Sequence, residues 1–180
     1  MGRDAAEDAA FTEFAAASRA RLRGTAYLLC GDWERASDHV QEGLIRVYVA
    51  WPRLVRRGSE FAYARKAVLS AFLDASRKRS STERPTSERP DCASGEDLAA
   101  AVVDREILMA ALARLPGRQR ACVVLRYFEE LDVRETAAAL GCSEGTVKSQ
   151  TSRALVSLRA MFLDASREEL VVAGESGLPW

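Results

Sequence analysis

Apolar residues recur every three or four positions through most of the chain, a spacing that predicts amphipathic helices. In the first half this spacing predicts three helices, over about 6–29, 33–50 and 61–79. After a stretch without apolar periodicity, it predicts further helices over about 96–115, 118–128 and 133–140, and from Glu144 onward. The pattern therefore predicts an all-α protein.

The breaks between these segments divide the chain into two parts. Gly31-Asp32 separates the first two helices, with Asp32 as a candidate cap. Pro52 is expected to end the second helix, because the residue before a proline disfavours helical angles. The stretch from Ser80 to about Gly95 holds two Arg-Pro steps and several serines, as linkers do. We expect two small helical domains joined by a flexible linker: a domain over 1–79, the linker over 80–103, a domain over 104–163, and a fraying tail over 164–180.

The stretch Val133 to Arg159 predicts two helices joined by a tight turn. Gly141 can take a positive φ and stop the first helix. Ser143 stands where the cap of the second helix belongs, with Glu144 in its first turn. Val147 would fill the gap where the two helices cross. The apolar stripe of the second helix is expected to be Val147, Ala154, Leu155, Leu158 and Phe162. A short helix, a glycine turn and a longer helix form the helix-turn-helix pattern.

One face of this second helix carries short polar and cationic side chains. Lys148, Ser149, Ser152 and Arg153 lie three and four residues apart, so they share one side. Such a face can enter a DNA major groove. Thr146 and the free N–H groups of the first turn suit a phosphate. The alternative is a solvated face on a helical hairpin.

A second cationic stretch lies between Pro52 and Arg79. Its eight cations are Arg53, Arg56, Arg57, Arg65, Lys66, Arg77, Lys78 and Arg79. Only Glu60 and Asp74 oppose them, which leaves a net charge of 8 − 2 = +6. Tyr63, Phe72 and Trp51 are interleaved, and cations beside aromatics suit single-stranded DNA. The alternative is that the aromatics belong to the core and that the last cations complement a helix C-terminus.

Composition limits the other functions. The 26 Lys and Arg residues balance 26 Asp and Glu residues, so any affinity for nucleic acid must come from local patches. The four cysteines are widely separated and His39 is the only histidine, which favours free thiols over a zinc site and predicts no cofactor. An acidic, polar N-terminus and the lack of a long apolar run predict a cytoplasmic protein.

Three stretches resemble sigma-70-type RNA polymerase sigma factors. The family's fourth conserved domain is similar to ALARLPGRQRACVVLRYFEELDVRETAAALGCSEGTVKSQTSRALVSLR, from Ala111 to Arg159. The polymerase-binding helix of its second domain is similar to ASDHVQEGLIRVYVAWPRL, from Ala36 to Leu54. The promoter-melting part of that domain is similar to YARKAVLSAFLDASRKR, from Tyr63 to Arg79. The order of the matches, with only a linker between them, resembles the short actinobacterial kind of the extracytoplasmic-function (ECF) group.

The resemblance implies a role for each polar surface. It implies that core RNA polymerase binds through its β′ clamp to Asp38, Gln41, Glu42 and Arg46. It implies that the upstream (−35) element is read as duplex by Lys148, Ser149, Ser152 and Arg153, beside Thr146. It implies that the −10 element is opened and held by Arg65, Lys66, Ser70, Asp74 and Arg77, with Lys78 and Arg79 beyond, and that the loop with Arg53, Arg56 and Arg57 cradles a flipped base. The implied partners are core polymerase (β′ clamp and β flap), promoter DNA and an anti-sigma factor, for a protein that is monomeric when free.

Several positions depart from the family pattern. Ser70 stands where Asn is usual, Ala75 and Ser76 replace Trp and Arg, and His39 replaces Leu, which leaves the promoter sequence and the strength of melting open.

Three other classes of function fit the sequence less well. A stand-alone helix-turn-helix regulator would need neither the polar face from Asp38 nor the basic third helix. An enzyme is disfavoured because the chain has no phosphate-binding Gly loop and no nucleophile elbow. An inhibitory mimic would bind polymerase without transcription.

Overall fold

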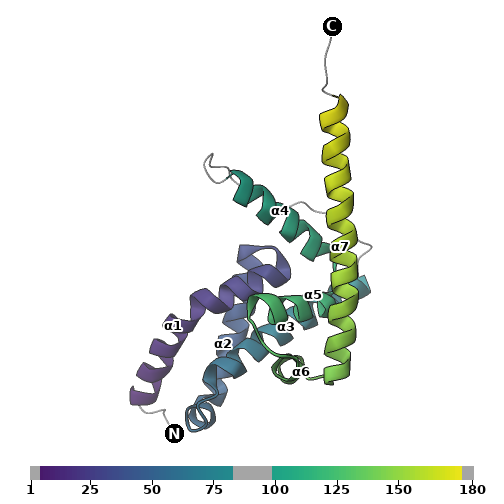
Figure 1. The fold of residues 1–180 in the computed structure, drawn as a ribbon. Coiled ribbons are helices and arrows are strands. Elements are labelled where there is room, and N and C mark those ends of the chain that lie inside the picture. The colour runs from purple at the N-terminus through teal and green to yellow at the C-terminus, as the bar shows by residue number, and fades with distance from the viewer. Residues whose placement is uncertain (1–4, 83–98, 176–180) are drawn as a thin grey trace.

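The computed structural model of the chain describes residues 5–82 and 99–175, with side chains described over 5–78 and 105–163 (Figure 1). The first three helices are α1 (Ala5–Cys30), α2 (Trp33–Val55) and α3 (Glu60–Thr82). The others are α4 (Ala99–Arg114), α5 (Gly117–Val123), the π-helical turn η2 (Val124–Phe128), α6 (Val133–Leu140) and α7 (Glu144–Glu175). The described residues contain no strand, so the all-α prediction is confirmed.

Helices α1, α2 and α3 form the N-terminal module, in which α2 packs against both neighbours. Leu22, Val47 and Val68 are almost fully buried between them. At Gly43 the helices approach so closely that a Cβ would lie 2.7 Å from Val68 Cγ2. Asp32 caps α2 as expected, because its carboxylate accepts the Arg35 N–H at 2.7 Å.

The predicted end of α2 is wrong, since the helix continues through Pro52 to Val55. Trp51 and Leu54 are 4% and 7% exposed, and their burial favours one more helical turn although proline removes one N–H donor. The basic loop is therefore confined to residues 56–59. Tyr48, which helical spacing over 33–50 places inside, is 38% exposed, and its hydroxyl donates a hydrogen bond to Asp8 Oδ1 at 3.1 Å.

His39 introduces a polar ring into this core. It is 8% exposed and lies edge-on to Phe72 with ring centroids 6.2 Å apart. Its Nε2 has no hydrogen-bond partner among the residues that the structure describes. Burial first, and then the charge of Arg35, lowers the pKa of His39. The folded state therefore holds the neutral ring and binds fewer protons than the unfolded state.

His39→Leu is expected to reduce the amount of stability that the protein loses as the pH falls. A lowered folded pKa gives stability that is complete above the ordinary value of about 6.5 and is lost as pH falls through the folded pKa. Below that ordinary value the variant should melt at a higher temperature than wild type. Thermal melts from about pH 8 to about pH 5 measure this. Equal losses of melting temperature in both proteins would contradict the prediction.

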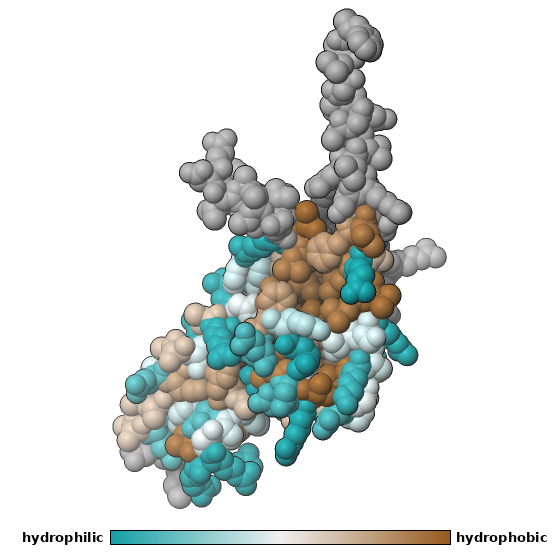
Figure 2. Space-filling model, in the orientation of Figure 1, coloured by the Kyte–Doolittle hydropathy of each residue, from teal (hydrophilic) through white to brown (hydrophobic). Residues whose placement is uncertain are grey.

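Helices α4 to α7, with η2, form the C-terminal module. Phe128, which helical spacing over 118–128 places inside, is 43% exposed, because the π-helical turn adds a residue and rotates the chain after Leu125. Leu155 and Phe162, also expected inside, are 37% and 38% exposed. Figure 2 shows hydrophobic residues gathered where α4 approaches α7.

The two modules pack against each other. α3 contacts α5 and α6, and α1 contacts α4, α5 and η2 (Figure 1). Two buried clusters take residues from both modules, and the smaller of them consists of Leu29, Leu69, Phe72, Ala121, Val124, Leu125 and Leu131. The sequence did not predict this shared core, because apolar periodicity shows which face is buried but not against which partner.

The ends of the modules also extend beyond the expected bounds. α3 runs to Thr82 and α4 begins at Ala99, so both ends of the predicted linker are helical, and its middle lies outside the described residues. α7 continues to Glu175, through much of the predicted tail, since neither proline nor glycine interrupts it between its first turn and Gly174. Among the helices described, none is long and apolar enough to cross a membrane.

Candidate functional site

The helix-turn-helix is fixed by local hydrogen bonds at its turn. Gly141 has φ 62°, the left-handed conformation expected for it, and ends α6 at the predicted residue. Ser143 Oγ accepts the Thr146 N–H at 3.1 Å and caps α7, which confirms the predicted cap. Val147 is fully buried between the helices. These bonds set the angle at which α7 leaves the turn.

A capping box at the start of α6 was missed by the sequence analysis. Asp132 Oδ1 accepts the Glu135 N–H at 2.7 Å, and Glu135 Oε2 accepts the Asp132 N–H at 2.8 Å. The spacing of a cap residue and a glutamate three positions later was the local pattern that could have located it.

The predicted reading face of α7 is exposed. Lys148, Ser149, Ser152 and Arg153 all face solvent, and within the described part of the chain neither cation is in an ion pair. Ser149 Oγ donates to the Thr146 carbonyl at 3.0 Å. The cap already uses the Thr146 N–H, so fewer first-turn donors remain for a phosphate than the sequence suggested.

The predicted polymerase face of α2 is exposed at Asp38, Gln41 and Glu42. Arg46 forms an ion pair with Glu42 one turn away in the same helix. Ile45 and Val49, which the sequence analysis did not select, are 57% and 67% exposed on the same helix. The surface is therefore mixed, with apolar area beside charge.

The basic stretch is divided between the surface and the core. Six of its cations are exposed: Arg53, Arg56, Arg57, Lys66, Arg77 and Lys78. Ser70 and Asp74 are half-buried, Asp74 pairs with Arg77, and the side chain of Arg79 lies outside the described residues. Trp51 and Phe72 belong to the core, so of the three aromatics only Tyr63 is exposed enough to stack on a base.

Arg65 is directed away from this surface. Its side chain is 13% exposed, and its Nη1 lies 3.6 Å from Glu129 Oε2 in the C-terminal module. The Glu129 carboxylate also accepts a hydrogen bond from Arg21 at 3.0 Å. Sequence reasoning missed Glu129 because no local pattern links residues more than sixty positions apart.

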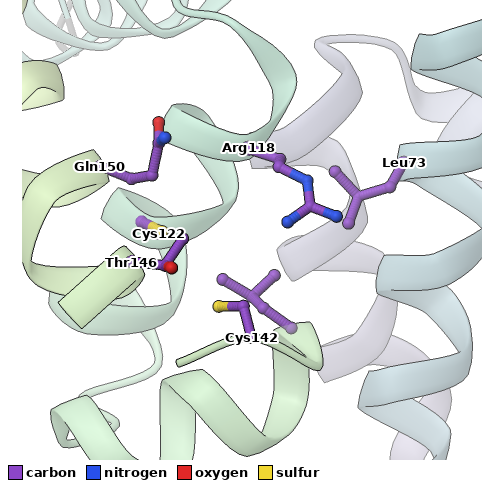
Figure 3. Close-up of a pocket in the computed structure, with 7 residues that line it drawn as sticks. Leu73, Arg118, Cys122, Cys142, Thr146 and Gln150 are labelled. Atoms are coloured by element: carbon purple, nitrogen blue, oxygen red, sulfur yellow. The ribbon is translucent and has the colours of Figure 1, made fainter. Parts of the chain in front are cut away.

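A small hollow lies beside the start of α7 (Figure 3). It is lined by Leu73, Arg118, Cys122, Leu140, Cys142, Thr146 and Gln150. Burial raises the pKa of Cys122 to about 11, so this thiol stays protonated at neutral pH and is a poor nucleophile. Cys30, Cys122 and Cys142 are free thiols, and the described residues contain no cluster of side chains suited to a metal ion.

Comparisons with known families agree on both modules. Residues 14–82 match the family described as sigma-70 region 2, and residues 105–158 match sigma-70 region 4. The RNA polymerase sigma-E factor of Streptomyces avermitilis is 38% identical over 149 residues, with 83% of each chain covered. The sigma-E factor of Streptomyces coelicolor is 37% identical over 166 residues, covering 88% of this chain and 93% of that one.

More distant proteins share the arrangement. The ECF RNA polymerase sigma factor SigM of Mycobacterium tuberculosis is 30% identical over 129 residues, covering 72% of this chain and 65% of that one. A solved structure of the sigma factor RpoE from Bartonella quintana, in complex with the anti-sigma factor NepR, aligns with a TM-score of 0.55 at 23% identity. It covers 84% of this chain and 96% of that chain, a likeness of fold. The chain belongs to the sigma-70 family of RNA polymerase sigma factors, in its extracytoplasmic-function group.

Proposed function

We propose that this sigma factor binds core RNA polymerase through α2, reads promoter duplex with α7 and holds the melted strand with α3. The observation that carries the proposal is the exposed face of α7. Its two cations, which form no ion pair with any side chain that the structure describes, lie on the outer side of a helix-turn-helix whose inner side is buried. The exposed face of α2 lies on a different helix from this DNA-reading face, and it is therefore assigned to a different partner, core polymerase.

The −35 element is assigned to the start of α7. Lys148 and Arg153 are long enough to reach base edges and phosphates, and Ser149 and Ser152 leave room for the groove wall. Thr146, at the first turn, is placed beside the backbone. An arginine that pairs with a guanine edge contributes about 1–3 kcal/mol of discrimination.

The −10 element is assigned to the basic surface that follows α2. Exposed cations would track the phosphates of the melted strand, while Tyr63 offers a ring for stacking. The group comprises Arg53, Arg56, Arg57, Lys66, Ser70, Asp74, Arg77, Lys78 and Arg79. Arg65 joins it only when Glu129 releases the guanidinium.

The β′ clamp is assigned to Asp38, Gln41, Glu42 and Arg46, with the neighbouring apolar area of α2. The β flap is the proposed contact of the C-terminal module. An anti-sigma factor is a further proposed partner, as the solved relative was crystallised with one. The protein is proposed to act in the cytoplasm, where its template is, without enzyme activity of its own.

Arg153→Ala is expected to lower transcription from the cognate promoter about 5- to 150-fold, the equivalent of about 1–3 kcal/mol. The promoter is found first by sequencing the 5′ ends of transcripts made on genomic DNA by core polymerase with and without the protein. Run-off transcription then compares the variant with wild type, and co-purification with core polymerase should be unchanged.

Arg114→Ala, which removes an exposed arginine at the end of α4, is the matched control and should transcribe normally. Wild-type transcription by Arg153→Ala on native and altered −35 elements alike would refute the assignment of α7. Transcripts that do not depend on the protein would refute the proposed function itself.

A further inference from the structure

The loop between α2 and α3 presents a serine shortly after two consecutive arginines. Residues 55–58 are all exposed, and Gly58 has a φ of 57°, which turns the chain toward α3. Ser59 is the last residue before the helix, is half-buried, and accepts the Tyr63 N–H on its carbonyl at 3.0 Å. The segment Arg56-Arg57-Gly58-Ser59 is therefore an exposed basic stretch that ends on a hydroxyl group.

The arginines of this region have no acidic partner. Arg53, Arg56 and Arg57 are exposed, and none of them forms an ion pair with a side chain that the structure describes. The Nε of Arg56 donates to a carbonyl of α2 at 3.0 Å, which leaves the outer N–H groups of this guanidinium for another ligand. The nearest acid in the sequence is Glu60, a single charge against three. An anion attached to the serine would therefore meet an excess of positive charge.

The hydroxyl of Ser59 is free to react. Other serines near helix starts use theirs: Ser143 Oγ accepts the Thr146 N–H at 3.1 Å, and Ser37 Oγ donates to the Trp33 carbonyl at 2.8 Å. Within the described ranges, Ser59 Oγ makes no hydrogen bond. Its reaction would break no contact of the fold.

These features fit the substrate of a serine kinase that selects basic segments. Such a kinase binds the arginines before the acceptor serine with carboxylates, because Arg–carboxylate pairs are strong and directional. Its co-substrate is ATP. Ser59 Oγ forms a bond to the γ-phosphorus, the bond from that phosphorus to the oxygen bridging to the β-phosphate breaks, and ADP leaves. The hydroxyl proton passes to the catalytic aspartate of the kinase.

We propose that Ser59 is a phosphorylation site for an arginine-directed serine kinase, and that its phosphate weakens binding of the melted strand to the basic loop. The inference rests on the proposed role of this loop in holding that strand. A phosphoserine carries about −1.5 to −2 charges at pH 7 and three acceptor oxygens. It pairs with Arg56 and Arg57 in place of a DNA phosphate. The polymerase face of α2 lies earlier in that helix and keeps its charge.

The first measurement maps where phosphate is added. The folded protein is incubated with ATP, Mg²⁺ and the catalytic subunit of cyclic-AMP-dependent protein kinase, an arginine-directed serine kinase, and phosphopeptides are identified by mass spectrometry. We expect phosphate on Ser59, added about tenfold more slowly, or slower still, in the variant Arg56→Gln with Arg57→Gln, which lacks the charged hydrogen bonds to the kinase. Ser80 and Ser81 also follow a basic run. Phosphate on these two serines without any on Ser59 would overturn the proposal.

The second measurement is binding of a labelled single-stranded oligonucleotide of random sequence, read by fluorescence anisotropy from about 50 to about 300 mM salt. The protein carries Ser80→Ala and Ser81→Ala, so that only Ser59 responds to the kinase. Two cations lost to the phosphate, at about 0.7 each, should reduce the slope of log K against log salt by about 1.4 and the affinity about tenfold near 150 mM salt. Ser59→Ala in the same background, treated with the kinase, is the control and should keep its affinity.

Untreated Arg56→Gln with Arg57→Gln separates the proposal from the function on which it rests. This variant should lose as much affinity as the phosphorylated protein, and thermal melts check that every variant is folded. If it loses affinity while phosphate on Ser59 changes nothing, the proposal is overturned and the role of the loop stands. If it binds like wild type, the role of the loop in holding the strand fails, and the proposed effect of the phosphate fails with it.

Discussion

The double variant Gln41→Ala with Glu42→Arg is expected to abolish co-purification with core RNA polymerase while leaving the fold intact. Both side chains are exposed, and the Glu42–Arg46 pair lost in the variant is a surface pair worth about 0–1 kcal/mol. At the interface the change is far larger. It places two arginines one turn apart, and a like charge at a docking surface costs several kcal/mol.

The measurement is co-purification of tagged protein with core enzyme, beside circular dichroism for the fold. Glu13→Arg, a charge reversal at an exposed position of α1, is the control and should bind normally. If the double variant co-purifies at the wild-type level, the face from Asp38 to Arg46 is not the docking surface.

The second large effect is the dependence of promoter binding on polymerase. The free protein should bind promoter duplex in the non-specific range of about 10⁻⁴–10⁻⁶ M at physiological salt. It has zero formal net charge and only Lys148 and Arg153 as cations on its reading face. Few phosphates are neutralised by two cations, and the affinity gained from released counterions is correspondingly small.

Core polymerase should tighten this binding about 10²- to 10⁴-fold, because it holds both modules at promoter spacing and makes the second contact intramolecular. An anisotropy titration near 150 mM salt, where the Debye length is about 8 Å, measures both states. Tight, sequence-specific binding by the protein alone, unimproved by core enzyme, would favour a stand-alone regulator instead.

The sequence was most informative where a single residue has a local structural consequence. Gly141 and Ser143 located the turn of the helix-turn-helix, because a positive φ and a side-chain cap act within four residues. The prediction from Pro52 was wrong because it took account of local effects alone. Its local cost was outweighed by the burial of Trp51 and Leu54, which depends on other helices.

The sequence predicted which faces of the candidate site are exposed, but it did not predict which side chains pair with one another. The exposed faces of α2 and α7 follow from helical spacing alone, and the structure leaves both open to solvent. The environment of Arg65 did not follow, because its counter-ion Glu129 comes from the other module. Phe128 was misplaced because a π-helical turn breaks the 3.6-residue period on which its assignment depended.

The shared core also limits how hybrid sigma factors can be built from this chain. Exchanging one module for that of a relative would replace half of the contact and leave Leu29 and Leu69, or Val124 and Leu125, without the surface they pack against. A transplanted module that lacked a carboxylate at position 129 would face Arg21 and Arg65 with nothing to neutralise them. Designers of orthogonal transcription circuits would have to move α1, α3 and η2 as one compatible set. Otherwise a chimera is expected to aggregate through its uncovered apolar surface, to bind DNA without polymerase, or both.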